Sequence, residues 1–259
     1  MVSTDDERLL QIAAAEGAKT GTEVVSAEFR PFKQFSFKWS HGGSVIEVSD
    51  YCDSAPDAAL ADLLQYIFAY ARLTERGDRE GAGDLAMGPD YVAYFNSDRF
   101  LQEKRPLYLR RSRNLARRDV GWYRNIFDSV QRLLDCGLLL PADLDNTYFT
   151  WTASANYTRL GYCNQMFRVV AISSVMDDLS VPEYVMDRVV YHECLHLRQR
   201  YRPFSRRPHD AEFRRQEKLY PMYRESELYM RGLPSKGRAL RNGRVRRHPF
   251  IINPHDSGT

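Results

Sequence analysis

The run of residues 181–201 constrains this chain more than any other stretch, and it reads VPEYVMDRVVYHECLHLRQRY. Val185, Val189 and Leu195 fall near one stripe at helical spacing, and no Gly or Pro follows Pro182 inside the run. Proline suits the first turn of a helix, because the N–H that it lacks would have no partner there. The pattern therefore predicts a helix that begins near Pro182 and carries the His-Glu-Cys-Leu-His segment.

The two histidines of this segment, His192 and His196, are one helical turn apart and therefore share one face of the helix. Two imidazoles stacked in this way can bind one metal ion at about 2.0–2.1 Å each. Glu193 lies beside them, where it can accept a proton from a water that the ion activates. This pattern is typical of zinc hydrolases. The alternative is an ordinary amphipathic helix with inert imidazoles, although unpaired polar groups are costly to bury in it.

A catalytic zinc ion takes three protein ligands and leaves one position open, so a further ligand is required. Pro203 and Pro208 predict that the helix ends and a loop follows, and a second short helix is expected before Pro221. His209 stands at the start of that second helix, where the loop can bring it back over the metal. We therefore predict His209 as the third ligand. The alternative is a histidine at a helix entry without a metal.

Two carboxylates of the second predicted helix, Glu212 and Glu217, are rivals for the third position, because some zinc peptidases take a Glu from a following helix. The metzincin pattern places Gly and His soon after the second His, and residues 197–202 contain neither. A three-His site can take other divalent ions, so Zn²⁺ is the default expectation for the metal.

The composition is that of a globular α+β chain without a membrane span. The chain has 259 residues, 43% hydrophobic and 27% charged, which suffices for one large or two small domains. Its N-terminus is acidic and then amphipathic, unlike a signal peptide, so a cytoplasmic location is expected. The four cysteines have no C-x-x-C spacing, which predicts free thiols and excludes a zinc ribbon. Cys194 is expected to pack in the core.

The net charge is only +3, but the arginines are unevenly distributed. Three clusters are present: Arg105, Arg110, Arg111, Arg113, Arg117 and Arg118; Arg198, Arg200, Arg202, Arg206 and Arg207; and Arg238, Arg241, Arg244, Arg246 and Arg247. Such clusters could contact the phosphates of a nucleic acid. A solvated charged face is the favoured interpretation.

Two halves are expected, 1–118 and 119–233, followed by a basic tail at 234–259. Periodicity predicts the elements of the first half as a helix over 4–17, strands within 23–40 and 44–49, a helix over 56–75, a loop over 77–90, a helix over 90–103 and a connector over 104–118. In the second half it predicts a helix over 119–136 with Trp122 facing inward, a strand over 147–154, Gly161 after it, and a strand over 165–173.

The two halves also resemble each other. SVIEVSDYCDSAPDAALADLLQYI is matched by RVVAISSVMDDLSVPEYVMDRVVYH, because each strand ends in Ser, each turn carries Asp, and Pro opens each apolar helix. With a two-residue gap, Tyr66 aligns with His192. Either a duplication whose first copy lacks metal ligands or a coincidence between two strand–turn–helix units would produce this pattern.

The second half resembles the SprT-like zinc metallopeptidases and the related YgjP-like group over about residues 119–221. The matching elements, in order, are a helix, a Trp-bearing strand, RLGYC at 159–163, the strand VVAISS, Pro182, VVYHECLHL, and HDAEF at 209–213. The resemblance implies a zincin-like domain, in which a small antiparallel or mixed sheet packs on the active-site helix. The departures are the Arg-rich loop after His196, Cys194 within the motif, and an N-terminal half without a counterpart.

We therefore expect zinc-dependent hydrolysis of protein or peptide substrates, with Glu193 as the general base. A peptide could add to residues 167–173 as an extra strand. Candidates for a second oxyanion donor are Tyr191, Tyr201, Tyr220 and Tyr223. One alternative function is a nucleic-acid-associated or scaffold module with a structural zinc, and another is hydrolysis of a non-peptide amide. Glu193 favours an enzyme, because a structural zinc does not need it.

Overall fold

The computed structural model describes residues 4–199 and 209–241, which form two compact α+β units. Unit 1 extends to Ser112 and unit 2 begins at Arg113, so the division falls a few residues before the expected boundary at 118. Within the described ranges, no helix is both long enough and apolar enough to cross a membrane. All four cysteines are free thiols, as predicted.

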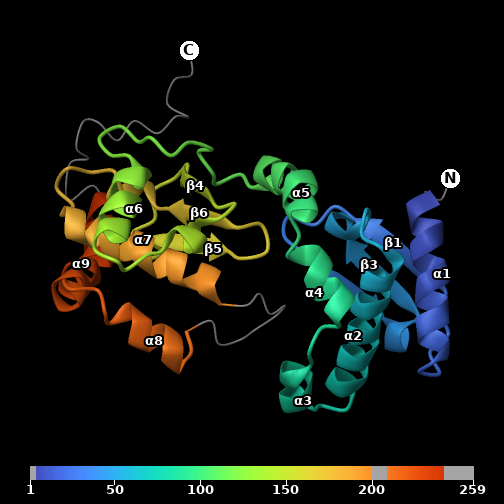
Figure 1. Ribbon diagram of the computed structural model, residues 1–259. Coiled ribbons are helices and arrows are strands. Elements are labelled where there is room, and N and C mark those ends of the chain that lie inside the picture. Colours follow the sequence, from blue (N-terminus) through green and yellow to red (C-terminus); the bar gives the residue numbers. More distant parts are fainter. Residues whose placement is uncertain (1–3, 200–208, 242–259) are drawn as a thin grey trace. The chain divides into compact units, whose positions relative to one another are not determined.

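Unit 1 is a three-stranded sheet with helices. Its elements are α1 (Thr4–Ala18), β1 (Ser26–Arg30), β2 (Phe37–Ser40), β3 (Val45–Ser49), α2 (Asp57–Glu75), α3 (Arg79–Asp84), α4 (Pro89–Phe95) and α5 (Asp98–Arg111), with the 3₁₀ helices η1 (His41–Gly43) and η2 (Asp50–Cys52) (Figure 1). The strand order is β1-β3-β2, in which β1 is parallel and β2 antiparallel to the central strand β3. Helices α1 and α2 pack against each other.

The predicted helices 4–17 and 56–75 are confirmed, but the region from 77 to 118 differs from the prediction. The expected loop contains α3, because the side chain of Asp78 accepts a hydrogen bond from Gly81 N and caps that helix. The helix expected over 90–103 is two helices, since Ser97 caps α5 by accepting from Phe100 N. Helix α5 then continues to Arg111 through most of the expected connector.

Unit 2 has a sheet of the same size with more helix after it. Its elements are α6 (Ile126–Asp135), β4 (Tyr148–Trp151), β5 (Gly161–Asn164), β6 (Val169–Ile172), α7 (Glu183–Arg198), α8 (Ala211–Glu217) and α9 (Tyr223–Arg241), with the 3₁₀ helices η3 (Pro141–Leu144) and η4 (Ser174–Met176). The strand order is β4-β6-β5, with β4 parallel and β5 antiparallel to β6. Helix α7 packs on β5 and β6, and α6, α8 and α9 pack on α7 (Figure 1).

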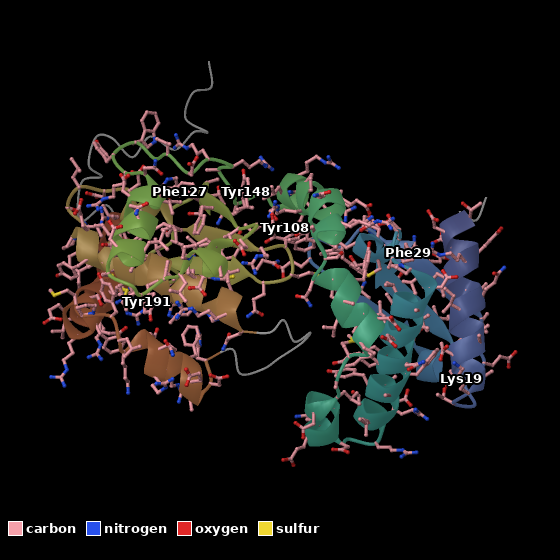
Figure 2. The ribbon with its side chains drawn as sticks, viewed as in Figure 1. Lys19, Phe29, Tyr108, Phe127, Tyr148 and Tyr191 are labelled. Carbon is pink, nitrogen blue, oxygen red and sulfur yellow. The ribbon has the colours of Figure 1, made fainter. Side chains whose placement is uncertain are left out.

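The core of unit 2 gathers around α7 (Figure 2). Tyr191 and Cys194 are fully buried on this helix, and Trp151 is 1% exposed on β4. Cys194 therefore packs in the core, as predicted. The predicted helix that begins near Pro182 and carries the His-Glu-Cys-Leu-His segment is confirmed as α7, with Pro182 as its N-cap residue.

Four other expectations for unit 2 are corrected. Helix α6 begins at Ile126 instead of 119, because Asn125 caps it and Asp177 accepts hydrogen bonds from the three backbone N–H groups before that cap. Trp122 is consequently 70% exposed and does not face inward. Strand β5 adds a third strand at Gly161, and α9 continues through Pro234, so the expected tail begins as helix.

The two units share one topology from the first strand to the long helix. In each, the central strand runs into a serine, Ser49 or Ser173, with the same backbone conformation (φ −59°, ψ 133°). A 3₁₀ turn follows, η2 or η4, and Pro56 or Pro182 then precedes the long helix in extended conformation. The strand–turn–helix match seen in the sequence thus corresponds to matching structure.

Candidate metal centre

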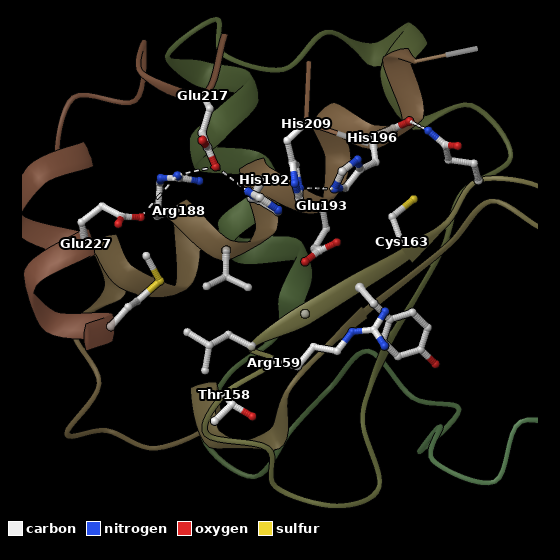
Figure 3. Close-up of a pocket in the computed structure, with 16 residues that line it drawn as sticks. Thr158, Arg159, Cys163, Arg188, His192, Glu193, His196, His209, Glu217 and Glu227 are labelled. Carbon is white, nitrogen blue, oxygen red and sulfur yellow. Dashed lines mark hydrogen bonds and ion pairs between the residues drawn. The ribbon is translucent and has the colours of Figure 1, made fainter. Parts of the chain in front are cut away.

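The three predicted metal ligands converge in unit 2 (Figure 3). His192 and His196 project from α7 with ring centroids 5.2 Å apart. His209 comes from the segment before α8, and its ring lies 5.0 Å from His192 and 4.9 Å from His196. One nitrogen from each imidazole lies within 4.8 Å of the others. This is the one group of three or more His, Cys, Asp or Glu side chains in the described ranges that could hold a metal ion.

Hydrogen bonds at the Nδ1 atoms of two imidazoles determine which ring nitrogens of the cluster face one another. His192 Nδ1 lies 2.5 Å from Glu217 Oε1, and His196 Nδ1 lies 3.1 Å from Gln199 Oε1, so the Nε2 atoms are left for a metal. His196 Nε2 and His209 Nε2 are 3.2 Å apart. Two ligands of a tetrahedral zinc ion with bonds of about 2.0–2.1 Å stand roughly 3.3 Å apart. The spacing of this one pair therefore matches two ligands of a tetrahedral ion, and the three imidazoles together could hold a metal ion.

The electrostatics of the histidines also suit a metal. Burial, together with the neighbouring imidazoles of His192 and His209, lowers the pKa of His196 to about 4. Burial and His192 lower the pKa of His209 in the same direction. Both rings are therefore neutral at pH 7, which is the form that binds a metal.

Phe213 forms the apolar support of the three rings. It is 3% exposed, and its ring centroid lies 5.0, 4.6 and 4.7 Å from those of His192, His196 and His209. Asp210 accepts a hydrogen bond from Phe213 N at 2.8 Å and so caps α8. This cap fixes the start of α8, which explains how a residue of the preceding loop is held over α7.

Glu193 is buried beside the histidines and lines the same cavity (Figure 3). Its side chain can sit there because β5 carries Gly161 at this point: a Cβ on Gly161 would lie 2.7 Å from Glu193 Oε1. Burial raises the pKa of Glu193 to about 7, although His192 and two arginines favour the charged form. A carboxyl group with this pKa is suited to accept and return a proton near neutral pH.

The two rival carboxylates are placed elsewhere. Glu212 is exposed and pairs with Arg215 at 2.7 Å. Glu217 contacts His192 on the side away from the other rings, and it also pairs with Arg188 at 2.6 Å. Burial alone would raise the pKa of Glu217, but the hydrogen bonds from His192 and Arg188 hold it down at about 2. Glu217, predicted only as a rival for the third ligand position, thus contacts a predicted ligand, and no sequence pattern indicated Arg188, one helical turn before His192.

The cavity has a volume of about 500 Å³ and opens between α7, α9 and the segment around β5. Its wall beyond the groups already described is formed by Thr158, Arg159, Leu160, Tyr162, Cys163, Gln165, Val189, Glu227 and Met230. The Arg159 guanidinium lies 4.8 Å from the centroid of the Tyr162 ring. Polar and apolar side chains thus both line the cavity that holds the histidine cluster, as in many ligand-binding pockets.

The tyrosines predicted as oxyanion donors serve other contacts. The Tyr191 hydroxyl donates to Gln216 O at 2.9 Å, and the Tyr220 hydroxyl donates to Tyr184 O at 2.8 Å. Tyr223 lies beneath the Arg188 guanidinium, and none of these three lines the cavity. Tyr201 lies outside the described residues. The tyrosine among the residues that line the cavity is Tyr162.

The predicted peptide-binding strand is also corrected. Residues 169–172 form β6, which is the central strand and pairs on both sides with β4 and β5. It therefore has no edge for a further strand. The edge strand next to the cavity is β5, and both Gly161 and Cys163 of this strand line the cavity.

The described arginines of the basic clusters include two that bind carboxylates of their own unit. Arg111 donates to both carboxylate oxygens of Asp50, and Arg198 pairs with Asp143 at 2.6 Å. These two guanidinium groups are thus held by carboxylates of their own unit. Several predicted members lie outside the described residues: Arg200, Arg202, Arg206, Arg207, Arg244, Arg246 and Arg247.

Comparison with protein-family models, with curated proteins and with solved structures found no match to this chain.

Proposed function

We propose that this protein is a zinc-dependent metallopeptidase, that unit 2 is its zincin-like domain, and that it is related to the SprT-like and YgjP-like group. The observation that carries the proposal is the convergence of His192, His196 and His209 on an open cavity that also holds Glu193. The mixed sheet with its antiparallel edge strand packed on α7 supports the same interpretation.

The three imidazoles would hold the metal through their Nε2 atoms, since the Nδ1 atoms of His192 and His196 already contact Glu217 and Gln199. When bound, a zinc ion supplies Lewis acidity, which polarises a carbonyl group and lowers the pKa of a water at the open position to about 7. The three rings would act as neutral ligands, in agreement with the lowered pKa of His196 and His209.

Glu193 would perform the proton transfers. It accepts one proton from the water whose oxygen attacks the carbonyl carbon of the scissile peptide bond. It then returns this proton to the leaving nitrogen as the C–N bond breaks, so that the products are a carboxylic acid and an amine. Its position next to His192, and the space left by Gly161, favour this role. A structural metal site would not need a buried carboxyl group of this kind.

The peptide substrate would lie along β5. An extended chain can add to an edge strand through backbone hydrogen bonds, and β5 is the strand that both ends the sheet and borders the cavity. The carbonyl to be attacked would then face Glu193 and the histidines. This arrangement replaces the binding strand that the sequence suggested.

The replacement Glu193→Gln tests the proposed function. The amide keeps the size of the side chain but cannot accept the proton, so hydrolysis of a casein-derived peptide mixture should fall by about 10²–10⁴-fold. Zinc content, measured by elemental analysis, should stay at the wild-type level because the three ligands are unchanged. Full activity in this variant would reject Glu193 as the base.

We further propose that unit 1 is a degenerate copy of the strand–turn–helix core of unit 2. The shared strand order, the matching serines and the proline before each long helix support a duplication over a coincidence. The first copy would have kept the scaffold and lost the catalytic side chains.

A further inference from the structure

A carboxylate from α8 contacts one of the three imidazoles at its outer nitrogen. Glu217 Oε1 lies 2.5 Å from His192 Nδ1 and 2.6 Å from an Arg188 guanidinium nitrogen (Figure 3). The Glu217 side chain is 14% exposed. One oxygen therefore accepts hydrogen bonds from both the histidine and the arginine.

Arg188 is fixed on several sides. It is 2% exposed, it lies one turn before His192 on α7, and its guanidinium is 4.9 Å from the centroid of the Tyr223 ring. Glu227 stands 3.9 Å away on its other side. A guanidinium stays charged in proteins, so its burial requires a carboxylate partner, and Glu217 is the nearer of the two. Arg188 thus holds the Glu217 carboxylate in one position.

The orientation of His192 follows from this contact. A carboxylate that accepts from Nδ1–H keeps the proton on Nδ1, and it leaves the lone pair on Nε2 pointing at the other two rings. His196 has a weaker counterpart, because the partner of its Nδ1 is the neutral amide of Gln199 at 3.1 Å. Of the two candidate ligands on α7, His192 therefore has a charged hydrogen-bond partner at Nδ1, whereas His196 has a neutral one.

We propose that Glu217, held by Arg188, is the positioning residue that orients His192 for the metal. This inference rests on the proposed function. It also gives α8 a second role, because the segment that supplies His209 at its start then supplies the orienting carboxylate for another ligand at its end.

The test is the affinity of the purified apoprotein for Zn²⁺ alone, measured by competition with a chromophoric chelator. Loss of a carboxylate that supports a metal-bound histidine costs 10–100-fold in metal affinity, and we expect this loss for Glu217→Ala. Glu217→Gln keeps an oxygen acceptor at the same position and should recover most of the affinity. The matched control is Glu212→Ala on the same helix, because Glu212 is exposed and contacts no histidine, and it should bind as the wild type does.

A second variant separates positioning from folding. Glu217→Ala leaves a buried arginine with its nearer partner gone, whereas the double replacement Arg188→Met with Glu217→Leu removes both charges together. We expect this double variant to melt near the wild-type temperature as apoprotein and still to bind Zn²⁺ at least tenfold more weakly. Wild-type affinity in Glu217→Ala or in the double variant would overturn the inference while the proposed function stands. A wild-type protein that binds no Zn²⁺ would overturn both.

Discussion

Unit 1 and unit 2 have the same strand order, yet the face that holds the histidine cluster in unit 2 is occupied by aromatic rings in unit 1. Tyr66 and Tyr70 of α2 stand at the same distance in sequence from Pro56 as His192 and His196 stand from Pro182. The two tyrosine rings are stacked, with centroids 5.9 Å apart and planes inclined by 18°. A face that presents metal ligands in one helix thus presents phenol rings in the other.

The neighbouring strand differs in the same way. Phe37 pairs with Val48 in unit 1, and Gly161 pairs with Ile172 in unit 2, each next to the serine that ends the central strand. The Phe37 ring lies 6.2 Å from Tyr66 and 6.1 Å from Tyr70. At the strand position where unit 2 has the glycine that leaves room for Glu193, unit 1 thus has a phenylalanine whose ring packs on α2. The shared topology therefore provides the same arrangement of strands and helix in both units. Whether a cavity forms depends on one small residue on β5 and on the polar residues on α7.

Among the changes that test this difference between the units, the largest effect on peptide hydrolysis is expected when a side chain is added at Gly161 of β5. Gly161→Ala places a Cβ 2.7 Å from Glu193 Oε1, so the carboxyl group must move. A displacement of this kind should reduce peptide hydrolysis on the order of 100-fold without loss of zinc. Turnover and zinc content should be measured together. The control is Gly232→Ala on α9, where nothing lies near the added Cβ. Unchanged turnover in Gly161→Ala would break the comparison.

A smaller effect, on the free energy of unfolding at high pH, is expected when Tyr66 in the aromatic face of unit 1 is replaced. Burial, with a contribution from Tyr70, raises the pKa of Tyr66 to about 12. The unfolded value is about 10, so this residue contributes stability that is complete below pH 10 and is lost as the pH rises towards 12. The contribution is of the order of 1–2 kcal/mol. Denaturant unfolding across this pH range should depend less on pH in Tyr66→Phe than in wild type. Equal pH dependence in the two proteins would contradict the burial of an ionisable phenol at this position.

No gain of metal binding by unit 1 is expected when histidines are introduced on α2 alone. The double replacement Tyr66→His and Tyr70→His copies the spacing of α7, but the Phe37 ring still packs on α2 at these positions. The described part of unit 1 also contains no group of three candidate ligands. Zinc per chain should therefore match the wild type in elemental analysis. A second equivalent of zinc would show that the helix alone is sufficient.

Sequence patterns within a single segment were sufficient to predict the long helices and two of the three candidate ligands. Proline at the first turn and an uninterrupted apolar stripe give α2 and α7, and the spacing of His192 and His196 follows from helical geometry. His209 was predicted because prolines before it require a loop and a short helix follows it. Its approach to the other two rings is now seen in the structure.

Other features depend on contacts between distant residues and have no local signal. Helix α6 starts late because Asp177, far along the chain, binds the backbone of the preceding loop. Strand β5 has four half-buried residues without alternation, so periodicity does not reveal it. The Arg188–Glu217 pair joins α7 to α8, whose residues are far apart in the sequence. The orienting role of a carboxylate therefore becomes visible only when both helices are placed.

The zinc content of the purified protein, compared with that of His209→Ala, tests the proposed metal centre most directly. We expect about one equivalent of zinc in the wild type and little in the variant, because a site with two imidazoles lacks the third protein ligand of a catalytic zinc. A wild type without zinc, or a variant that retains the full equivalent, would contradict the proposal that these three histidines hold one metal ion.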